Sequence, residues 1–497
     1  MWARFAIAGV LILLLSGATT ATFALTKLNK IAHEVFPKGS QIHVAKGVVQ
    51  AAYSGEAQTF LIIGSDRRAE SKDAFDRNNP PHSDTLLLVR LDPHTGQTSV
   101  LSIPRDLLVT ITTKSGQVYY PRKVNAAYTI GSLEGGTARG AELVAETIEH
   151  LLHVKLNGVI DVTFKGFIDV VDTLGCVYVN VDHRYLHEND GNPEENYSEI
   201  NLQPGYQKLC YEKALSYVRY RHDDSDFVRV ARQQDFIRDL REQVPAGNLI
   251  GEIDKVSKAV GKAVTSTFQS SASQLIELAK LAAFSQDKPL RQVKFRAENV
   301  DAMIGGESYV TSSPPLIQAT VRDFLYGHEQ LKLAPSTSTA HPKHHHATHS
   351  SSDARLDLYA ASAEGRDMAL RASPDLPFSL EFPSVQTGPS VFQEVHLYTL
   401  EDPLKHLHHA YVSVWQQSGL GGYYDVEGID WPDIPLFNHA ATQQIDGRQY
   451  MLVDDGAHIQ DLGWREGRVV YFVTNTLLEE LSNAQMIAIA QSTQPPH

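Results

Sequence analysis

The stretch FLIIGSD, residues 60–66, is the first strong globular signal in the chain. Four apolar residues close on Gly-Ser-Asp, a pattern typical of a strand that ends in a loop. A second apolar run, residues 85–91, meets a third, residues 99–103, across Asp92-Pro93-His94-Thr95-Gly96, whose Pro and Gly suit a reversing turn. These runs predict one strand followed by a β-hairpin.

Helical and strand patterns alternate beyond the hairpin. Apolar residues recur at helical spacing over residues 138–152, and the β-branched runs 159–164 and 177–181 flank a helical stretch. Further helices are expected from Asp226 to about Gln243 and within residues 250–284. The alternation predicts a layered α/β domain.

The amino-terminal segment carries no charge from residue 5 to residue 25, with Arg4 before it and Lys27 after it. We interpret it as one membrane-spanning segment that follows a cytoplasmic terminus, residues 1–4, and precedes a juxtamembrane stalk, residues 26–55. Ser and Thr dilute the segment, so a cleaved signal peptide is the alternative. Both interpretations place the rest of the chain outside the cytoplasm.

The carboxyl-terminal third is separated by a change in composition. Residues 329–354 are rich in Ser, Thr and His, which predicts a flexible linker. Beyond it, short apolar runs predict a small accessory α+β domain over residues 355–497, closed by a helix that Ser482 and Gln485 can cap.

Composition excludes several classes of protein. The chain has 497 residues, 42% of them hydrophobic and 21% charged, which is enough apolar surface for two or three folded units. With 44 basic against 58 acidic side chains the net charge is −14, which argues against nucleic-acid binding. Two cysteines are too few for a disulfide scaffold or an iron–sulfur protein.

Carboxylates and an arginine stand at the ends of the predicted strands. Asp66 follows the first strand, Asp84 opens the second and Arg105 follows the third. Carboxylates that converge on one edge of a sheet can hold Mg²⁺ when substrate phosphates complete its coordination shell. Taken singly, each Asp is more often a turn cap.

A second group of polar residues lies in RYRHDDSDFVRVARQQ, residues 219–234. Arg219 and Arg221 are two positions apart and point the same way in an extended stretch, whereas Arg229 and Gln233 are one helical turn apart. Four such donors can bind a pyrophosphate, because guanidinium groups bind phosphate oxygens through two hydrogen bonds. The alternative is a solvated face of arginines paired with neighbouring aspartates.

Five ordered motifs over residues 57–327 together resemble the LytR-CpsA-Psr (LCP) family. They are Gly64-Ser65-Asp66-x-Arg68, Ser83-Asp84-Thr85, Ser102-Ile103-Pro104-Arg105-Asp106, Lys123-x-Asn125-Ala126-Ala127-Tyr128, and Arg219-x-Arg221 through Arg229-x-x-Arg232-Gln233. The resemblance implies a central mixed β-sheet flanked by helices over residues 56–328.

The resemblance also implies an activity. LCP proteins are bacterial membrane-anchored phosphotransferases that move a glycopolymer from a polyprenyl-pyrophosphate carrier to peptidoglycan on the extracytoplasmic side. It further implies Mg²⁺ as cofactor, held by Asp66 and Asp84. The catalytic set is then Asp66, Asp84 and Arg105, and the pyrophosphate-binding set is Arg105, Arg219, Arg221, Arg229 and Gln233.

Two positions depart from the family pattern. His82 stands before Ser-Asp, where the family often has Arg, and Gly175-Cys176 replaces the family's Gly-Gly. A second cysteine, Cys210, makes a disulfide with Cys176 the expected arrangement in an exported protein, and two buried thiols the alternative.

Two other functions remain open from the sequence. A polyprenyl-pyrophosphate hydrolase would use the same residues with water as the acceptor. A membrane-anchored lipid-binding or sensing protein would hold the lipid without turnover, although such a protein does not require a magnesium site.

Overall fold

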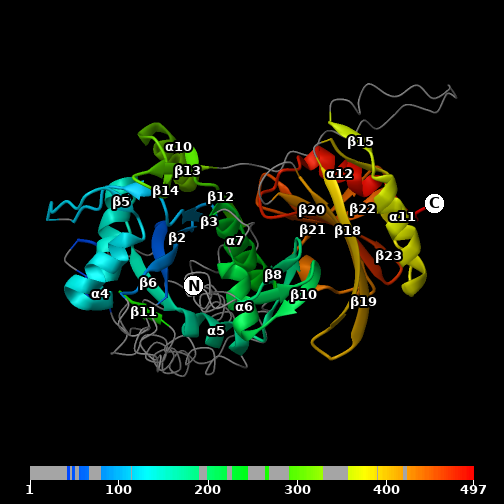
Figure 1. Cartoon of the computed structure of the whole chain (residues 1–497), viewed down its shortest axis with the longest axis horizontal. Helices are drawn as coiled ribbons and strands as arrows, with labels where there is room; N and C mark the ends of the chain where they lie inside the picture. Colours follow the sequence, from blue (N-terminus) through cyan, green and yellow to red (C-terminus); the bar gives the residue numbers. More distant parts are fainter. Residues whose placement is uncertain are drawn as a thin grey trace. The chain divides into compact units, whose positions relative to one another are not determined.

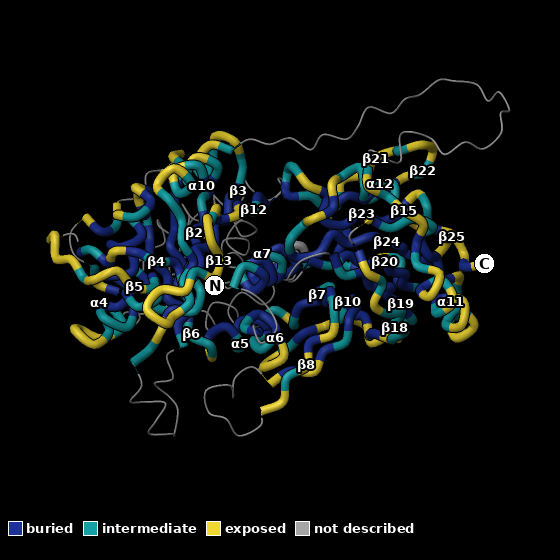
Figure 2. Tube along the Cα trace, turned by 45° about the horizontal axis from the view of Figure 1, so that its top comes forward, coloured by how far each residue is buried: buried dark blue, intermediate teal, exposed yellow. Residues whose placement is uncertain are grey.

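The computed structural model describes residues 42–44, 47–50, 55–66, 80–113, 115–189, 199–220, 226–243, 264–267, 290–327, 356–388, 390–417 and 422–497. These residues form two compact units, each with its own buried strands (Figures 1 and 2). The first unit contains Met1–Val177, Cys210–Arg219 and Phe236–His328, and the second contains Tyr178–Leu209, Tyr220–Asp235 and Glu329–His497.

The first unit is built on a six-stranded mixed sheet in the order β11-β6-β1-β2-β3-β12. Strands β1 and β6 pair in parallel, as do β3 and β12, whereas the other neighbours are antiparallel. The sheet confirms the expected mixed α/β architecture. Its strands are β1 (Gln58–Ser65), β2 (Ser83–Asp92), β3 (Gln97–Ile103), β6 (Gly158–Thr163), β11 (Val264–Ser266) and β12 (Leu290–Val293).

Strands β2 and β3 form the predicted hairpin, and Gly96 adopts a positive φ of 71° in its turn. Strand β11 corrects the helix expected within residues 250–284, because Val264 and Thr265 are β-formers that pair with the edge of β6. Most of the remainder of that stretch lies outside the described residues, as do the segment 5–25 and the linker, residues 329–354.

Helices and short strands complete the first unit. They are β4 (Leu108–Val109), β5 (Arg122–Lys123), α4 (Ala126–Leu152), α5 (Phe164–Thr173), α6 (Tyr211–Arg219), β13 (Asn299–Ile304), β14 (Glu307–Thr311) and α10 (Pro314–Tyr326). Helix α4 contacts β6 and β5 and is kinked at Gly135–Gly136, where the backbone leaves helical geometry (Figure 1). Leu143, Val144 and Ile148 on this helix are fully buried, so this face forms part of the core.

Helix α7 (Asp226–Gln243) has the bounds that the sequence predicted. Its residues 226–235 belong to the second unit and 236–243 to the first. The predicted apolar face is confirmed at Ile237 and Leu240, which are buried, whereas Phe227 and Val230 are only half-buried.

Cys176 and Cys210 form the predicted disulfide, with their Cα atoms 4.8 Å apart. Cys176 directly precedes β7 (Val177–Val181) and Cys210 directly follows β10 (Gly205–Leu209), two strands that pair with each other. Cys176 has a φ of 71°, a left-handed conformation that glycine adopts without steric cost. A cysteine therefore occupies this position at a backbone cost that the disulfide can offset.

The second unit is centred on a seven-stranded antiparallel sheet in the order β18-β19-β20-β24-β23-β22-β21. Its strands are β18 (Val391–Glu401), β19 (Leu407–Gln416), β20 (Tyr423–Ile429), β21 (Ala441–Ile445), β22 (Arg448–Asp454), β23 (Ile459–Glu466) and β24 (Val469–Asn475).

Short elements surround this sheet. They are β8 (Tyr185–His187), β9 (Ile200–Leu202), β15 (Leu358–Ala360), α11 (Ala363–Ala372), η3 (Ser373–Asp375), β16 (Phe382–Pro383), β17 (Val385–Thr387), η4 (Pro435–Phe437), α12 (Asn483–Gln491) and β25 (Thr493–Gln494). The predicted capping box at Ser482 and Gln485 begins α12.

The α+β class expected for residues 355–497 is corrected, because this part of the chain is mostly β. Runs of Val, Tyr and Trp pair through tight turns, such as the one at Asp446-Gly447, where both residues have positive φ. The meander buries most of the apolar residues, and only α11 and α12 contribute longer helices among the described residues.

Residues 178–209, predicted to belong to the first domain, pack against this C-terminal sheet. The Tyr178 hydroxyl donates to the Glu401 carbonyl at 2.7 Å, and the Asn180 side-chain amide donates to Thr474 Oγ1 at 2.9 Å. The Tyr206 N–H donates to a Glu427 carboxylate oxygen at 3.2 Å. The second unit therefore includes strands from the central part of the chain as well as the C-terminal third.

No helix among the described ranges has the length and apolar character that a bilayer crossing requires.

Candidate active site

Asp66 and Asp84 lie at one edge of the mixed sheet. Strand β1 ends at Ser65, and the antiparallel pairing of Gly64 with Thr85 and Ser65 with Ser83 leaves Asp84 as the extra residue of a β-bulge. Bulges redirect a side chain locally and are frequent beside functional sites. Gly64 suits this close pairing, because a Cβ there would lie only 3.0 Å from the Cβ of Thr85.

Arg105 binds Asp84 directly. The β2–β3 register pairs Leu86 with Ile103, and its continuation brings Arg105 opposite Asp84. Arg105 Nη1 lies 2.6 Å from Asp84 Oδ1, and only 12% of the arginine side chain and 21% of the aspartate side chain are exposed. Arg105 Nε also lies 3.4 Å from Asp106 Oδ2. The guanidinium group is thus held between two carboxylates.

Asp66 forms two hydrogen bonds with the backbone of His82. The His82 N–H donates to Asp66 Oδ1 at 2.6 Å, and the Asp66 N–H donates to the His82 carbonyl at 3.1 Å. The half-exposed imidazole Nδ1 lies 3.8 Å from Asp66 Oδ2. His82, the departure from the family pattern, therefore contacts Asp66 through both its backbone and its ring.

The Asn125 motif anchors α4 to the same edge. The Asn125 N–H donates to the Arg105 carbonyl at 3.2 Å, and the Ser83 hydroxyl donates to the Asn125 carbonyl at 3.4 Å. Three residues later, the buried Tyr128 hydroxyl donates to Asp161 Oδ2 on β6 at 2.7 Å. These contacts hold the start of α4 beside Asp84 and Arg105.

Arg219 lies at the adjacent strand end. Its Cζ is 4.1 Å from the centre of the Phe164 ring, a cation–π contact. Phe164 directly follows Thr163, the last residue of β6, and Thr163 pairs with Ser65 of β1. The sheet register therefore places Arg219 at the edge where Asp66 follows β1.

Arg229 and Gln233 lie on α7, one turn apart on a single face, and 3% and 7% of the two residues are exposed. Arg229 forms an ion pair with Asp226 three residues earlier. Both residues belong to the second unit. Arg221 lies outside the described residues.

The donors at the sheet edge suit a hard divalent cation. Asp66 and Asp84 supply carboxylate oxygens from adjacent strands, the ligand type that Mg²⁺ prefers, and both are partly exposed so that substrate oxygens and water can complete the shell.

Several contacts of the site were not anticipated from the sequence. Phe164 beneath Arg219 is a single aromatic residue with no local pattern. Asp106 Oδ1 forms an ion pair with Lys123 Nζ at 3.0 Å, which joins the motif that contains Arg105 to the motif that contains Asn125. The presence of both motifs in the sequence is the one signal that these two residues lie close together.

The chain matches the LytR_cpsA_psr family over residues 22–323. It is 27% identical over 286 residues to biofilm regulatory protein A of Streptococcus mutans, which covers 56% of this chain and 65% of that protein. It is 32% identical over 187 residues to the polyisoprenyl-teichoic acid–peptidoglycan teichoic acid transferase TagV of Bacillus subtilis, which covers 37% of this chain and 44% of the relative. The matches thus span about half to two thirds of these relatives.

Solved structures show likeness over a similar share of the chain. A crystal structure of a Streptococcus agalactiae protein is 25% identical, covers 54% of this chain and 87% of its own, and has a TM-score of 0.46. The crystal structure of Bacillus subtilis TagV is 22% identical, covers 55% and 97%, and has a TM-score of 0.43. Because the family match extends over more than half of the residues, the chain belongs to the LytR_cpsA_psr family.

Proposed function

We propose that this protein is a Mg²⁺-dependent phosphotransferase that moves a glycopolymer phosphate from a polyprenyl-pyrophosphate carrier to a peptidoglycan sugar hydroxyl. The names of relatives such as TagV describe transfer of teichoic acid between a polyisoprenyl carrier and peptidoglycan. The observation that carries the proposal is the contact of Asp84 with Arg105 at the sheet edge, with Asp66 and Arg219 at the neighbouring strand ends.

The residues have separate tasks in this reaction. Arg105 and Arg219 bind the pyrophosphate oxygens, and Arg221, Arg229 and Gln233 extend this set by family resemblance. Asp66 and Asp84 would hold Mg²⁺, which would supply positive charge to the transferring and leaving oxygens. The acceptor hydroxyl forms a bond to the sugar-side phosphorus, and the bond from that phosphorus to the bridging oxygen breaks. Polyprenyl phosphate leaves, and the hydroxyl proton passes to this phosphate or to solvent.

Asp84 acts in this scheme as a ligand rather than as the proton acceptor. Its Oδ1 lies 2.6 Å from Arg105 Nη1, so this oxygen already accepts a guanidinium proton. The task of Asp84 is therefore to hold charge and geometry at the edge of the sheet.

The test uses the purified full chain with a labelled lipid-linked saccharide and a peptidoglycan acceptor. Asp84→Asn keeps the shape but removes a metal-binding charge, so turnover should fall at least about 100-fold while lipid binding persists. Arg219→Ala should lose both lipid binding and turnover. Asp92→Asn is the matched control, because Asp92 lies at the other end of β2 and its Oδ1 accepts the His94 N–H, a bond that Asn preserves.

Wild-type rates in both Asp84→Asn and Arg219→Ala would overturn the proposal. Release of free polymer phosphate without an acceptor would instead assign hydrolysis, and retained lipid with no product would assign lipid binding alone.

A further inference from the structure

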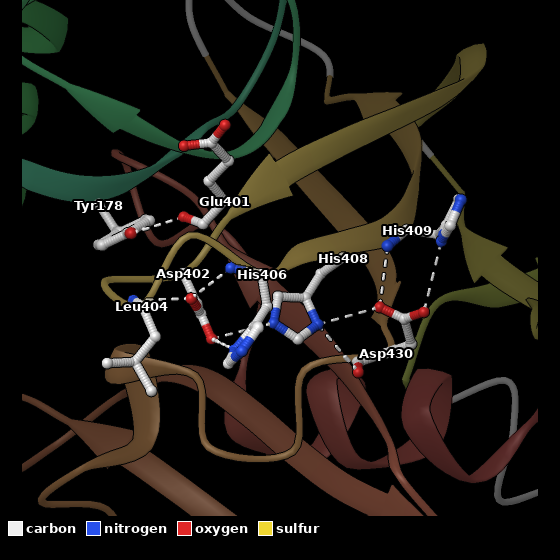
Figure 3. A network of polar contacts seen from close by, with 8 residues as sticks. All are labelled: Tyr178, Glu401, Asp402, Leu404, His406, His408, His409 and Asp430. Atoms are coloured by element: carbon white, nitrogen blue, oxygen red, sulfur yellow. Dashed lines mark hydrogen bonds and ion pairs between the residues drawn. The ribbon is translucent and has the colours of Figure 1, made fainter.

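Five titratable side chains in the second unit alternate between histidine and aspartate (Figure 3). His406 Nδ1 lies 2.9 Å from Asp402 Oδ2, and the same oxygen is 3.5 Å from His408 Nε2. On its other side, His408 Nδ1 lies 3.3 Å from Asp430 Oδ1, and His409 Nδ1 lies 3.5 Å from Asp430 Oδ2. The row connects the β18–β19 loop with the residue that follows β20.

This row is held rigidly. Asp402 Oδ1 accepts the N–H groups of Leu404 and His406 at 2.8 and 2.9 Å. Burial opposes ionisation of Asp402, but these hydrogen bonds and those from the two imidazoles lower its pKa to about 2. The His408 ring stacks on Trp431, with ring centres 5.3 Å apart and planes 10° apart. These contacts fix the positions of the Asp402 and His408 side chains before any ligand binds.

The geometry does not suit a metal centre on His408. One ring nitrogen faces Asp402, and the other faces both the carbonyl and the carboxylate of Asp430, at 3.2 and 3.3 Å. Both nitrogens are thus already engaged by oxygen acceptors, and a metal ion would need one of them.

Three members of the row, His406, His408 and Asp430, line a pocket of about 490 Å³, within the range of small-ligand sites. Its polar lining comes from His406, His408, Asp430 and Arg468, and its apolar lining includes Phe378 and Leu407. The Phe378 ring is itself packed against Tyr411 and Tyr471, with ring centres 6.2 and 6.4 Å apart, so it is a fixed platform.

This combination of groups matches a sugar that carries negative charge. The carbon face of a pyranose ring can pack on Phe378, while the Asp430 carboxylate accepts hydrogen bonds from neighbouring hydroxyls. The Arg468 guanidinium can bind a carboxylate or phosphate through two parallel hydrogen bonds. Phe378, Asp430 and Arg468 thus each have a counterpart in such a ligand.

We propose that this pocket, lined by Phe378, His406, Asp430 and Arg468, is a binding site for a short anionic saccharide. The inference rests on the proposed function for the origin of the ligand, since N-acetylmuramic acid carries a lactyl carboxylate where it bears no peptide, and a phosphate-linked glycopolymer carries phosphate. The pocket would hold one of these chains through a part of the molecule that does not contain the transfer site residues Asp66, Asp84 and Arg105.

Calorimetric titration of the full chain tests the site without any transfer assay. The probes are N-acetylglucosaminyl-N-acetylmuramic acid, which carries a carboxylate, glucose 1-phosphate, and neutral N,N′-diacetylchitobiose. Saturable binding of at least one anionic probe, tighter than that of the neutral one, is expected. The preferred anionic probe identifies the polymer that the pocket holds.

Variants make the test specific. Arg468→Ala should weaken binding of the anionic probe at least tenfold and leave the neutral probe nearly unchanged, whereas Asp430→Asn should weaken both. Arg465→Ala is the matched control, because this exposed arginine on β23 pairs with Asp433 and does not line the pocket. Unchanged unfolding temperatures check that the variants are folded.

Absence of saturable binding of every probe to the wild-type chain, or equal binding by wild type and Arg468→Ala, would refute the site. Because binding is measured without lipid substrate, a chain that binds saccharide but transfers nothing refutes the proposed function and leaves this site standing. A chain that transfers normally but binds no probe refutes this site and leaves the proposed function standing.

Discussion

Arg105 Nη1 lies 2.6 Å from Asp84 Oδ1, so the predicted phosphate-binding arginine and the predicted metal-binding carboxylate are bonded to each other. The two side chains therefore act as one unit. In the proposed reaction, substrate phosphate would share this guanidinium with Asp84, and the cation would share the carboxylate with Arg105.

Arg105→Lys and Asp84→Asn should consequently be non-additive in turnover. Each single change should lower the rate at least about 100-fold, and the double variant should lose far less than the product of the two, because either change already breaks the pair. Initial rates of the four proteins measure this coupling. Fully multiplicative losses would show that the two side chains work independently.

Removal of the Cys176–Cys210 disulfide should destabilise the fold. The bridge closes a loop of 34 residues, which corresponds to about 4 kcal/mol in the chain-entropy model. The Cys176→Ser/Cys210→Ser double variant should show a lower midpoint in denaturant and lipid binding close to wild type. Thiol titration of the unfolded, unreduced wild type should find no free thiol, and two titratable thiols would contradict the pairing.

Local patterns made part of the architecture predictable. The turn residues between the two apolar runs predict the β2–β3 hairpin, and the helical spacing of apolar residues predicts the bounds of α7. Both signals come from residues that are close together in the sequence. The disulfide was inferred from a departure from the family motif rather than from spacing. The sequence identifies site residues such as Asp84 and Arg105 because the five motifs occur in the same order as in the family.

Long-range contacts explain what the sequence did not show. The parallel pairing of β1 with β6 joins segments about 100 residues apart, and no local periodicity specifies it. The sequence predicts an α+β class for the C-terminal domain because a short apolar run can form either a helix or a strand, and only its pairing partner decides which. Asp402 and Asp430 are 28 positions apart, so the pocket they support emerges only once β18, β19 and β20 have assembled.

Glu427 makes the stability of the second unit depend on pH. Burial raises its pKa from 4.5 to about 8, against the opposing hydrogen bonds from the Tyr398 hydroxyl and the Tyr206 N–H. Its contribution is fully present below pH 4.5, where the carboxyl is protonated in both states. It declines with rising pH, by up to about 1.4 kcal/mol per pH unit, until the folded form has also ionised above pH 8.

Glu427→Gln should therefore flatten the fall in unfolding free energy between pH 4.5 and pH 8, measured by denaturant titration at several pH values. Burial also raises the pKa of Asp425, which therefore lowers the unfolding free energy with rising pH in both the wild type and the variant. The quantity to compare is the difference between their unfolding free energies at each pH. Glu466→Gln, at an exposed position on β23, is the control and should follow wild type. A variant with the wild-type pH profile would contradict this assignment.

A chain that ends near residue 330 should fold less stably than the full chain. The Tyr178 ring packs against Tyr206 and Trp431, with ring centres 5.8 and 5.3 Å apart, and its hydroxyl binds the Glu401 carbonyl. Removing residues 355–497 exposes Tyr178 and Tyr206, and burying an aromatic side chain of this size is worth roughly 1.5–3 kcal/mol. We expect a lower unfolding midpoint and a smaller yield of monomer in size-exclusion chromatography.

A full-length chain with a protease site inserted in the linker, residues 329–354, separates loss of contacts from loss of connection. After cleavage its two fragments should elute together, because the contacts of residues 178–209 with the C-terminal sheet do not depend on the linker. Separation of the fragments at micromolar concentration, together with a truncated chain as stable as the intact protein, would show that the C-terminal third is independent of the central segment.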